Sequence, residues 1–159
     1  MDDCVFCRIY EEDLSIIYEN ELFFSRFDAF PVTPGHAEVI PIKHVESFFD
    51  LNDKDLDKMF EAIKETKEII ERTDFREVYR EMMNKPVNEK SKKFCKDVLG
   101  TLFINKKPDG YNIGINDGRS AGRTVDHLHV HLIPRYSGDM KDPTGGVRYV
   151  IPEKGNYKW

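Results

Sequence analysis

Three histidines at alternate positions near the C-terminus, His127, His129 and His131, are the residues of this chain best placed to do chemistry. In a β-strand they would share one face, while the apolar residues between them would share the other. On a straight strand the α-carbons of His127 and His131 lie about 13 Å apart, whereas zinc holds its nitrogen ligands at about 2.0–2.1 Å. The three cannot all bind one metal ion, so we expect them to have different roles. If the three histidines were purely structural, all six ring nitrogens would need hydrogen-bond partners, because a buried polar group without one is costly.

A pair of cysteines, Cys4 and Cys7, is the second chemical signal, and Cys95 is the only other cysteine. The pair could be a redox dithiol, half of a metal site or two small buried residues. A redox pair normally precedes a helix in a βαβ unit, and the sequence lacks that pattern. Three cysteines are too few for a disulfide framework, which favours a reducing compartment.

The elements that position these residues are strands at both ends of the chain around a helical middle, so the fold class is α+β with a mainly antiparallel sheet. β-favouring runs predict strands over residues 15–18, 22–27, 36–42, 111–116 and 127–133, with a short β-like stretch over 147–151.

The middle of the chain has helical periodicity. Asn52 or Asp53 can cap a helix whose apolar residues recur at helical spacing as far as Ile70. The charged stretch from about 73 to 107 keeps a helical stripe up to Pro86. It then predicts a short helix from about Ser91 that buries Phe94, Val98 and Leu102. These helices either present solvated faces or form a lid or partner surface.

Bulk composition limits the function classes. With 159 residues, 40% hydrophobic and 33% charged, the chain fits one domain. A net charge of -5 gives no general attraction to nucleic acid or anionic membranes. Because the sequence shows no signal peptide and no apolar run of about 20 residues, we expect a cytoplasmic protein.

Several separated blocks together resemble the histidine triad (HIT) family of nucleotide hydrolases and transferases. These are Gly114-x-Asn116, residues 121–125, the triad with Leu132-Ile133-Pro134-Arg135, and the upstream matches Phe6, Asp28, Pro34-Gly35-His36, Val39-Ile40-Pro41 and Lys43-His44. The resemblance implies a HIT domain over residues 1–136, with a charged helical insertion at about 73–107. A C-terminal tail, 137–159, would pack on the domain or on a partner. It also implies a five-stranded sheet with helices on one side, and a homodimer that forms a continuous sheet.

The resemblance further implies roles for individual residues. His129 is the nucleophile that forms a covalent nucleotidyl intermediate. The phosphate oxygens are held by His131, Asn116, Gly122 and Thr124, and Asp28 binds the ribose. The alternative for Phe6 and Phe27 as walls of the base site is that they are simply core residues. The alternative for Asn116 and Gly122 is that they do no more than form a turn. In the zinc-containing subset of the family, the ligands would be Cys4, Cys7, His44 and His127, a closed structural Zn²⁺ site.

Arg123 departs from the family pattern, which usually has glutamine at this position. Its planar, fixed charge suits phosphate, so it favours a polyphosphate leaving group, which Mg²⁺ could accompany. The alternative is an exposed arginine paired to Asp117 or Asp126.

The resemblance therefore favours a hydrolase that cleaves an adenine nucleotide, preferably a dinucleoside polyphosphate such as a diadenosine polyphosphate, at its α-phosphate. Within the same family the alternative is a nucleoside phosphoramidase. Two rivals come from other classes: a nucleotide-binding signalling module with little turnover, and a metalloenzyme whose triad holds zinc and activates water.

Overall fold

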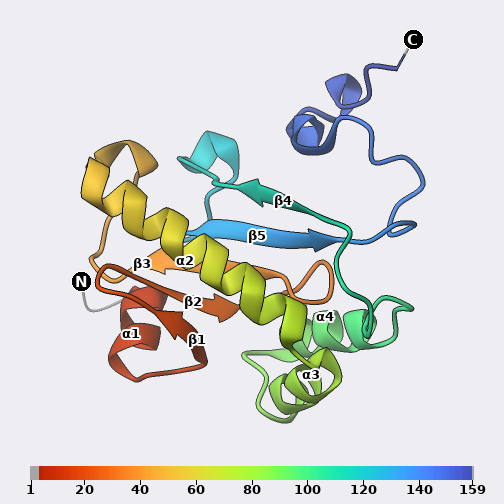
Figure 1. Ribbon diagram of the computed structural model, residues 1–159, viewed down its shortest axis with the longest axis horizontal. Coiled ribbons are helices and arrows are strands. Elements are labelled where there is room, and N and C mark those ends of the chain that lie inside the picture. Colours follow the sequence, from red (N-terminus) through yellow and green to blue (C-terminus); the bar gives the residue numbers. More distant parts are fainter. Residues whose placement is uncertain (1–3, 159) are drawn as a thin grey trace.

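Five antiparallel strands form one sheet in the order β1-β2-β3-β5-β4 (Figure 1). The structure is a computed structural model and describes residues 4–158. The strands are β1 (Ile16–Glu19), β2 (Phe23–Phe27), β3 (Ala37–Pro41), β4 (Gly110–Gly114) and β5 (Val130–Arg135). The predicted α+β class with a five-stranded antiparallel sheet is confirmed.

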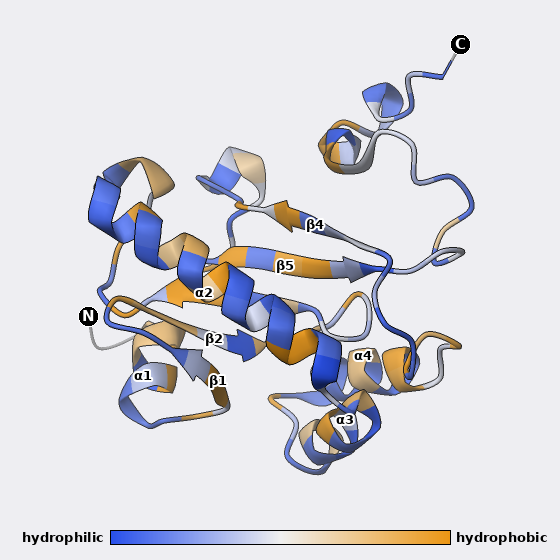
Figure 2. Ribbon diagram, in the orientation of Figure 1, coloured by the Kyte–Doolittle hydropathy of each residue, from blue (hydrophilic) through white to orange (hydrophobic). Residues whose placement is uncertain are grey.

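The long helix α2 (Asp53–Arg72) covers one face of the sheet. Asn52 caps it through a reciprocal pair of hydrogen bonds with Asp55, as its position before the apolar periodicity predicted. Its buried Met59 and Ala62 pack with Phe23, Val39 and Val130 of the sheet. The opposite side of α2 is hydrophilic in Figure 2, as expected for an amphipathic surface helix.

Helices α3 (Phe75–Asn84) and α4 (Glu89–Leu99) form most of the charged stretch and lie on the same face as α2. Phe75, Tyr79, Cys95 and Val98 are buried with Phe27, Ala37 and Leu132 of the sheet. The two predicted helices therefore exist. The expectation that Leu102 would be buried is wrong, because α4 ends at Leu99 and Leu102 is 86% exposed.

Helix α1 (Val5–Glu11) was not predicted and packs on the opposite face, where its Phe6 and Ile9 contact Phe24 and Ile40. The same face carries the strand side chains that point away from α2. We call it the histidine face, because His36 and His131 lie on it. α1 brings the N-terminal cysteines to this face.

Two predicted strands differ from the structure. β5 begins only at Val130, so His127 and His129 lie in the segment before it, and the picture of three histidines on one regular strand is wrong. Residues 146–150 form a 3₁₀ helix (Gly146–Val150) instead of a strand, because Gly145 and Gly146 have φ of +98° and +48° and start a tight turn.

Beyond β5 the chain lies against β4 at Gly146–Val150 and then projects away from the sheet (Figure 1). Val147, Val150, Ile151 and Tyr157 of this tail are exposed. Within residues 4–158, no helix is long and apolar enough to cross a membrane.

Candidate active site and metal centre

Four side chains with metal-binding atoms converge beside α1. The ligand atoms of Cys4, Cys7, His44 and His127 all lie within 4.8 Å of one another. His127 Nδ1 is 3.3 Å from Cys4 Sγ and 3.6 Å from Cys7 Sγ, and His44 Nδ1 is 3.4 Å from Cys7 Sγ. Zn–S and Zn–N bonds of about 2.3 and 2.0–2.1 Å at tetrahedral angles place S and N about 3.6 Å apart. The four residues fit a zinc ion.

The surroundings of His127 support this fit. Its Nε2 lies 2.9 Å from the carbonyl oxygen of Pro41, and because a carbonyl can only accept, Nε2 carries the proton and Nδ1 keeps a lone pair for a metal. Burial lowers the pKa of His127 to about 4, so its ring is neutral at pH 7. Burial also raises the pKa of the Cys7 thiol to about 11, so a bound metal would have to displace that proton.

His129 is buried and held by the backbone. Its Nδ1 lies 2.8 Å from the carbonyl oxygen of His127, so Nδ1 donates and Nε2 has the free lone pair. The ring of Phe6 lies 5.1 Å from that of His129, and His131 packs edge-on at 5.0 Å. Phe6 therefore borders the histidines while also belonging to the core around α1.

His131 belongs to a second cluster, with His36 and Asp28. His36 Nε2 is 3.1 Å from His131 Nδ1, and His36 Nδ1 is 3.3 Å from Asp28 Oδ2. Burial lowers the pKa of both histidines, that of His131 to about 4, so both rings are neutral at pH 7. The cluster could hold a cation, but it offers one carboxylate and two nitrogens, which is a poor match for the oxygen ligands that Mg²⁺ requires.

The loop after β4 brings Asn116 and Gly122 together. A Cβ on Gly122 would lie 3.9 Å from Asn116 Cγ, and the φ of +97° at Gly122 is one that other residues rarely adopt. Thr124 follows two residues later and is exposed.

Arg123 is tied down within the protein. It donates to the backbone oxygen of Glu46 at 2.9 Å and lies 3.1 Å from the Glu46 carboxylate and 3.2 Å from that of Asp126. Its side chain is only 13% exposed. The pairing to Asp126 was one of the two anticipated alternatives, whereas Asp117 instead accepts from Ser47 and from the backbone of Phe48.

Phe27 does not reach this site. It lies on the α2 face of the sheet, packed edge-on against Phe75, because its neighbours across the ladder are Ala37 and then Leu132. Phe27 therefore does not border the histidines, since the strand alternation that places Asp28 near them turns Phe27 away; it lines a pocket between the β1–β2 hairpin and helix α3 instead.

Sequence reasoning gave no role to two buried charged residues on the histidine face. Glu38 lies opposite His131 on one side and Arg26 on the other. The sequence did contain a sign of them, because both are charged residues within strands that were predicted to be central and therefore buried.

The structure thus places His129 and His131 beside a cluster of two cysteines and two histidines that could hold a metal ion. A model of the HIT domain matches residues 10–138, and the chain belongs to the HIT domain family. Members of this family generally act on nucleotides as hydrolases or transferases.

Individual relatives agree with this assignment. A HIT-like protein of Methanocaldococcus jannaschii is 31% identical over 86% of this chain and 81% of its own. An AP-4-A phosphorylase of Mycobacterium tuberculosis is 28% identical over 92% of this chain and 60% of its own. A zinc-bound histidine triad protein of Mycobacterium smegmatis has 30% identity and a TM-score of 0.56, covering 89% of this chain and 84% of its own.

Proposed function

We propose that this protein cleaves a nucleotide at its α-phosphate through a covalent nucleotidyl-His129 intermediate. The observation that carries the proposal is the hydrogen bond from His129 Nδ1 to the carbonyl oxygen of His127. It fixes the ring so that the nitrogen with the lone pair, Nε2, is available as a nucleophile.

The reaction has two displacements. His129 Nε2 attacks the α-phosphorus while the bond to the leaving group breaks, and the leaving group departs with the electron pair. Water then attacks the same phosphorus and gives up a proton to solvent, the P–N bond breaks with its electron pair returning to Nε2, and the nucleoside monophosphate is released with His129 restored. In both steps charge develops on the phosphate oxygens, where we place His131, Asn116, and the Gly122 and Thr124 backbone as donors.

Asp28 is proposed to bind the ribose. Its Oδ1 accepts from the backbone nitrogen of Phe30 and its Oδ2 faces His36. It is 8% exposed, at the end of β2 beside His131, where a sugar attached to the phosphate at His129 can reach it.

The zinc site is proposed to be structural. Cys4, Cys7, His44 and His127 would hold the ion with no position left for water. When bound, zinc would link α1 to the segment before β5 through its coordination bonds. Because His127 also carries the carbonyl that orients His129, the tetrad and the nucleophile are linked through one residue. This division of roles favours the nucleotidyl-histidine mechanism over water activated on a triad-bound metal.

A dinucleoside polyphosphate is the proposed substrate class, on the basis of the AP-4-A phosphorylase relative and the arginine at position 123. A nucleoside phosphoramidate is the second candidate. The observation that favours it is that Arg123 already has Glu46 and Asp126 as partners, so it has less charge to offer a polyphosphate leaving group.

Dimerisation through the sheet is also part of the proposal. β4 is an edge strand with Ile113 half exposed, and the tail beside it carries exposed apolar residues. Exposed apolar residues that gather in one patch mark protein–protein contact surfaces. The free cysteines fit a cytoplasmic protein.

Steady-state rates on diadenosine tetraphosphate and on an adenosine phosphoramidate test the proposal, with His129→Ala and Lys64→Ala, on the exposed side of α2, as variant and control. We expect His129→Ala to lose activity on both substrates and Lys64→Ala to keep it. Full activity of His129→Ala would rule out the mechanism, and tight nucleotide binding without turnover of either substrate would favour a signalling module.

A further inference from the structure

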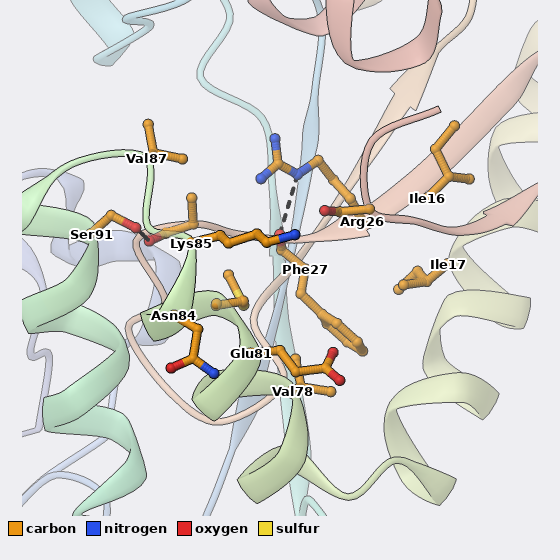
Figure 3. A pocket seen from close by; sticks show the side chains of 13 residues that line it. Ile16, Ile17, Arg26, Phe27, Val78, Glu81, Asn84, Lys85, Val87 and Ser91 are labelled. Carbon is orange, nitrogen blue, oxygen red and sulfur yellow. Dashed lines mark hydrogen bonds between the residues drawn. The ribbon is translucent and has the colours of Figure 1, made fainter. Parts of the chain in front are cut away.

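A pocket of about 650 Å³ opens where the β1–β2 hairpin meets helices α3 and α4 (Figure 3). Ile16 and Arg26 line it from the hairpin, and Val78, Lys85, Val87 and Ser91 line it from the helical stretch. Its size falls within the range of small-molecule sites. The charged helical stretch 73–107 thus builds one wall of a cavity that the sheet alone would not enclose.

Arg26 is a buried cation in this pocket whose hydrogen-bonding capacity is largely unused. It is 9% exposed, and its Nε donates to the backbone oxygen of Phe27 at 3.2 Å. Its nearest carboxylate, Glu38, lies 3.8 Å away, beyond hydrogen-bond distance. Within residues 4–158, the two terminal NH₂ groups have no hydrogen-bond partner. Because the contacts with Phe27 and Glu38 are both made through Nε, the two NH₂ groups are left to hydrogen-bond a ligand in the pocket.

Lys85 adds a second donor group to the same pocket. In Figure 3 its ammonium group and the guanidinium group of Arg26 both project toward the middle of the cavity from opposite walls. Arginine and lysine only donate hydrogen bonds, so the part of a ligand that faces these two groups must present acceptors. Glu81 and Asn84 of the same lining can accept, while Ile16, Val78 and Val87 offer apolar contact to a flat or hydrophobic body.

The sheet register places Arg26 in line with the histidines. His131 on β5 lies opposite Glu38 on β3, and Glu38 lies opposite Arg26 on β2. Two strand spacings separate Arg26 from His131, or about 10 Å. If the α-phosphate lies at His129 and the ribose at Asp28, the base would extend along this row toward Arg26.

We propose that this pocket receives the nucleobase and prefers a 6-oxopurine, such as guanine, over adenine. The inference rests on the proposed function, because it takes the phosphate to lie at His129. Guanine presents O6 and N7 as two neighbouring acceptors, and the arginine fork matches them with two hydrogen bonds. Adenine presents an amino group at the O6 position, so it opposes donor to donor and leaves part of the buried guanidinium unpaired.

Equilibrium binding of GMP, IMP and AMP to the zinc-loaded protein, measured by titration calorimetry, tests the inference. These monophosphates are products, so binding is measured without turnover. We expect GMP and IMP to bind at least about tenfold more tightly than AMP, as one bidentate base contact would give. IMP has O6 and N7 but lacks the 2-amino group of guanine, so its behaviour isolates the contact assigned to Arg26.

Two variants of Arg26 and one control complete the experiment. Arg26→Met should reduce the affinity for GMP about tenfold and leave that for AMP unchanged, and the AMP result reports whether the variant is folded. Arg26→Lys keeps the charge but loses the fork, so it should also lose most of the preference. Arg80→Met removes an exposed arginine of α3 outside the pocket lining and should change nothing.

Equal binding of GMP and AMP, a match between IMP and AMP, or an unchanged preference in Arg26→Met would overturn the base assignment and leave the proposed function intact. If none of the three nucleotides binds, the proposed function fails together with the inference.

Discussion

Replacing Glu38 with glutamine should change how the stability of the protein depends on pH. Glu38 is 7% exposed, and burial, with a further contribution from Asp28, raises its pKa from 4.5 to about 8 despite the nearby Arg26. The charged and titratable groups around it on the histidine face are Arg26, Asp28, His36 and His131.

The sign follows from the raised pKa. Between 4.5 and about 8 the unfolded chain has lost the Glu38 proton while the folded protein keeps it, so the free energy of unfolding falls as pH rises. The limiting slope is about 1.4 kcal/mol per pH unit. From pH 6.5 to 8, where the folded carboxyl becomes half ionised, the loss comes to about 1.6 kcal/mol.

The histidines act in the opposite direction at lower pH. Burial lowers the pKa of His131 from 6.5 to about 4, so it makes the protein more stable as pH rises through that interval, and its effect is nearly complete above 6.5. The interval from 6.5 to 8 is therefore the one in which Glu38 shows most clearly.

Urea unfolding at pH 6.5, 7, 7.5 and 8 measures the effect. Relative to wild type, Glu38→Gln should gain about 1.6 kcal/mol over that range, because its neutral amide does not titrate. Glu65→Gln, an exposed change on α2, serves as the matched control and should follow wild type. Parallel curves for wild type and Glu38→Gln would refute the assignment of a neutral buried Glu38.

Further predictions concern the metal, the loop and the helical stretch. The purified protein should contain one zinc per chain by mass spectrometry, and Cys7→Ala should lose the metal and melt at a lower temperature; a full complement of zinc in Cys7→Ala would exclude Cys7 as a ligand. Arg123→Gln should reduce turnover of a dinucleoside polyphosphate more than that of a phosphoramidate, and equal losses would remove Arg123 from leaving-group binding. Tyr79→Phe should cost about 1–3 kcal/mol in urea unfolding, because the backbone nitrogen of Gly35 donates to the Tyr79 hydroxyl at 2.7 Å in a buried setting; a change below about 0.5 kcal/mol would contradict this.

The parts of the fold that the sequence predicted are those with strong local signals. The capping residue Asn52 and the helical spacing after it give α2, and the alternating apolar residues around Phe23 and Val39 give central strands. α1 was missed because its seven residues are held by contacts with Phe24 and Ile40 across the sheet, and such long-range packing leaves little periodicity in a short segment.

In the candidate site, too, some features were predicted from the sequence and others depended on long-range structure. The ligand set Cys4, Cys7, His44 and His127 was predicted from residue types and family resemblance, and the structure brings all four together. Strand register decided the rest: it turns Phe27 into the core and places Arg26 beside Glu38 on the histidine face. A one-residue shift in register would exchange those faces, which is why the sequence alone could not assign them.

Trapping the covalent intermediate tests the central claim most directly. Wild-type protein mixed with a dinucleoside polyphosphate, quenched within milliseconds and digested, should yield a peptide carrying one nucleoside monophosphate on His129 by mass spectrometry. His129→Ala should yield no such peptide, and the adduct should disappear as turnover finishes. Turnover without any labelled histidine, or with the label on a residue other than His129, would contradict the account.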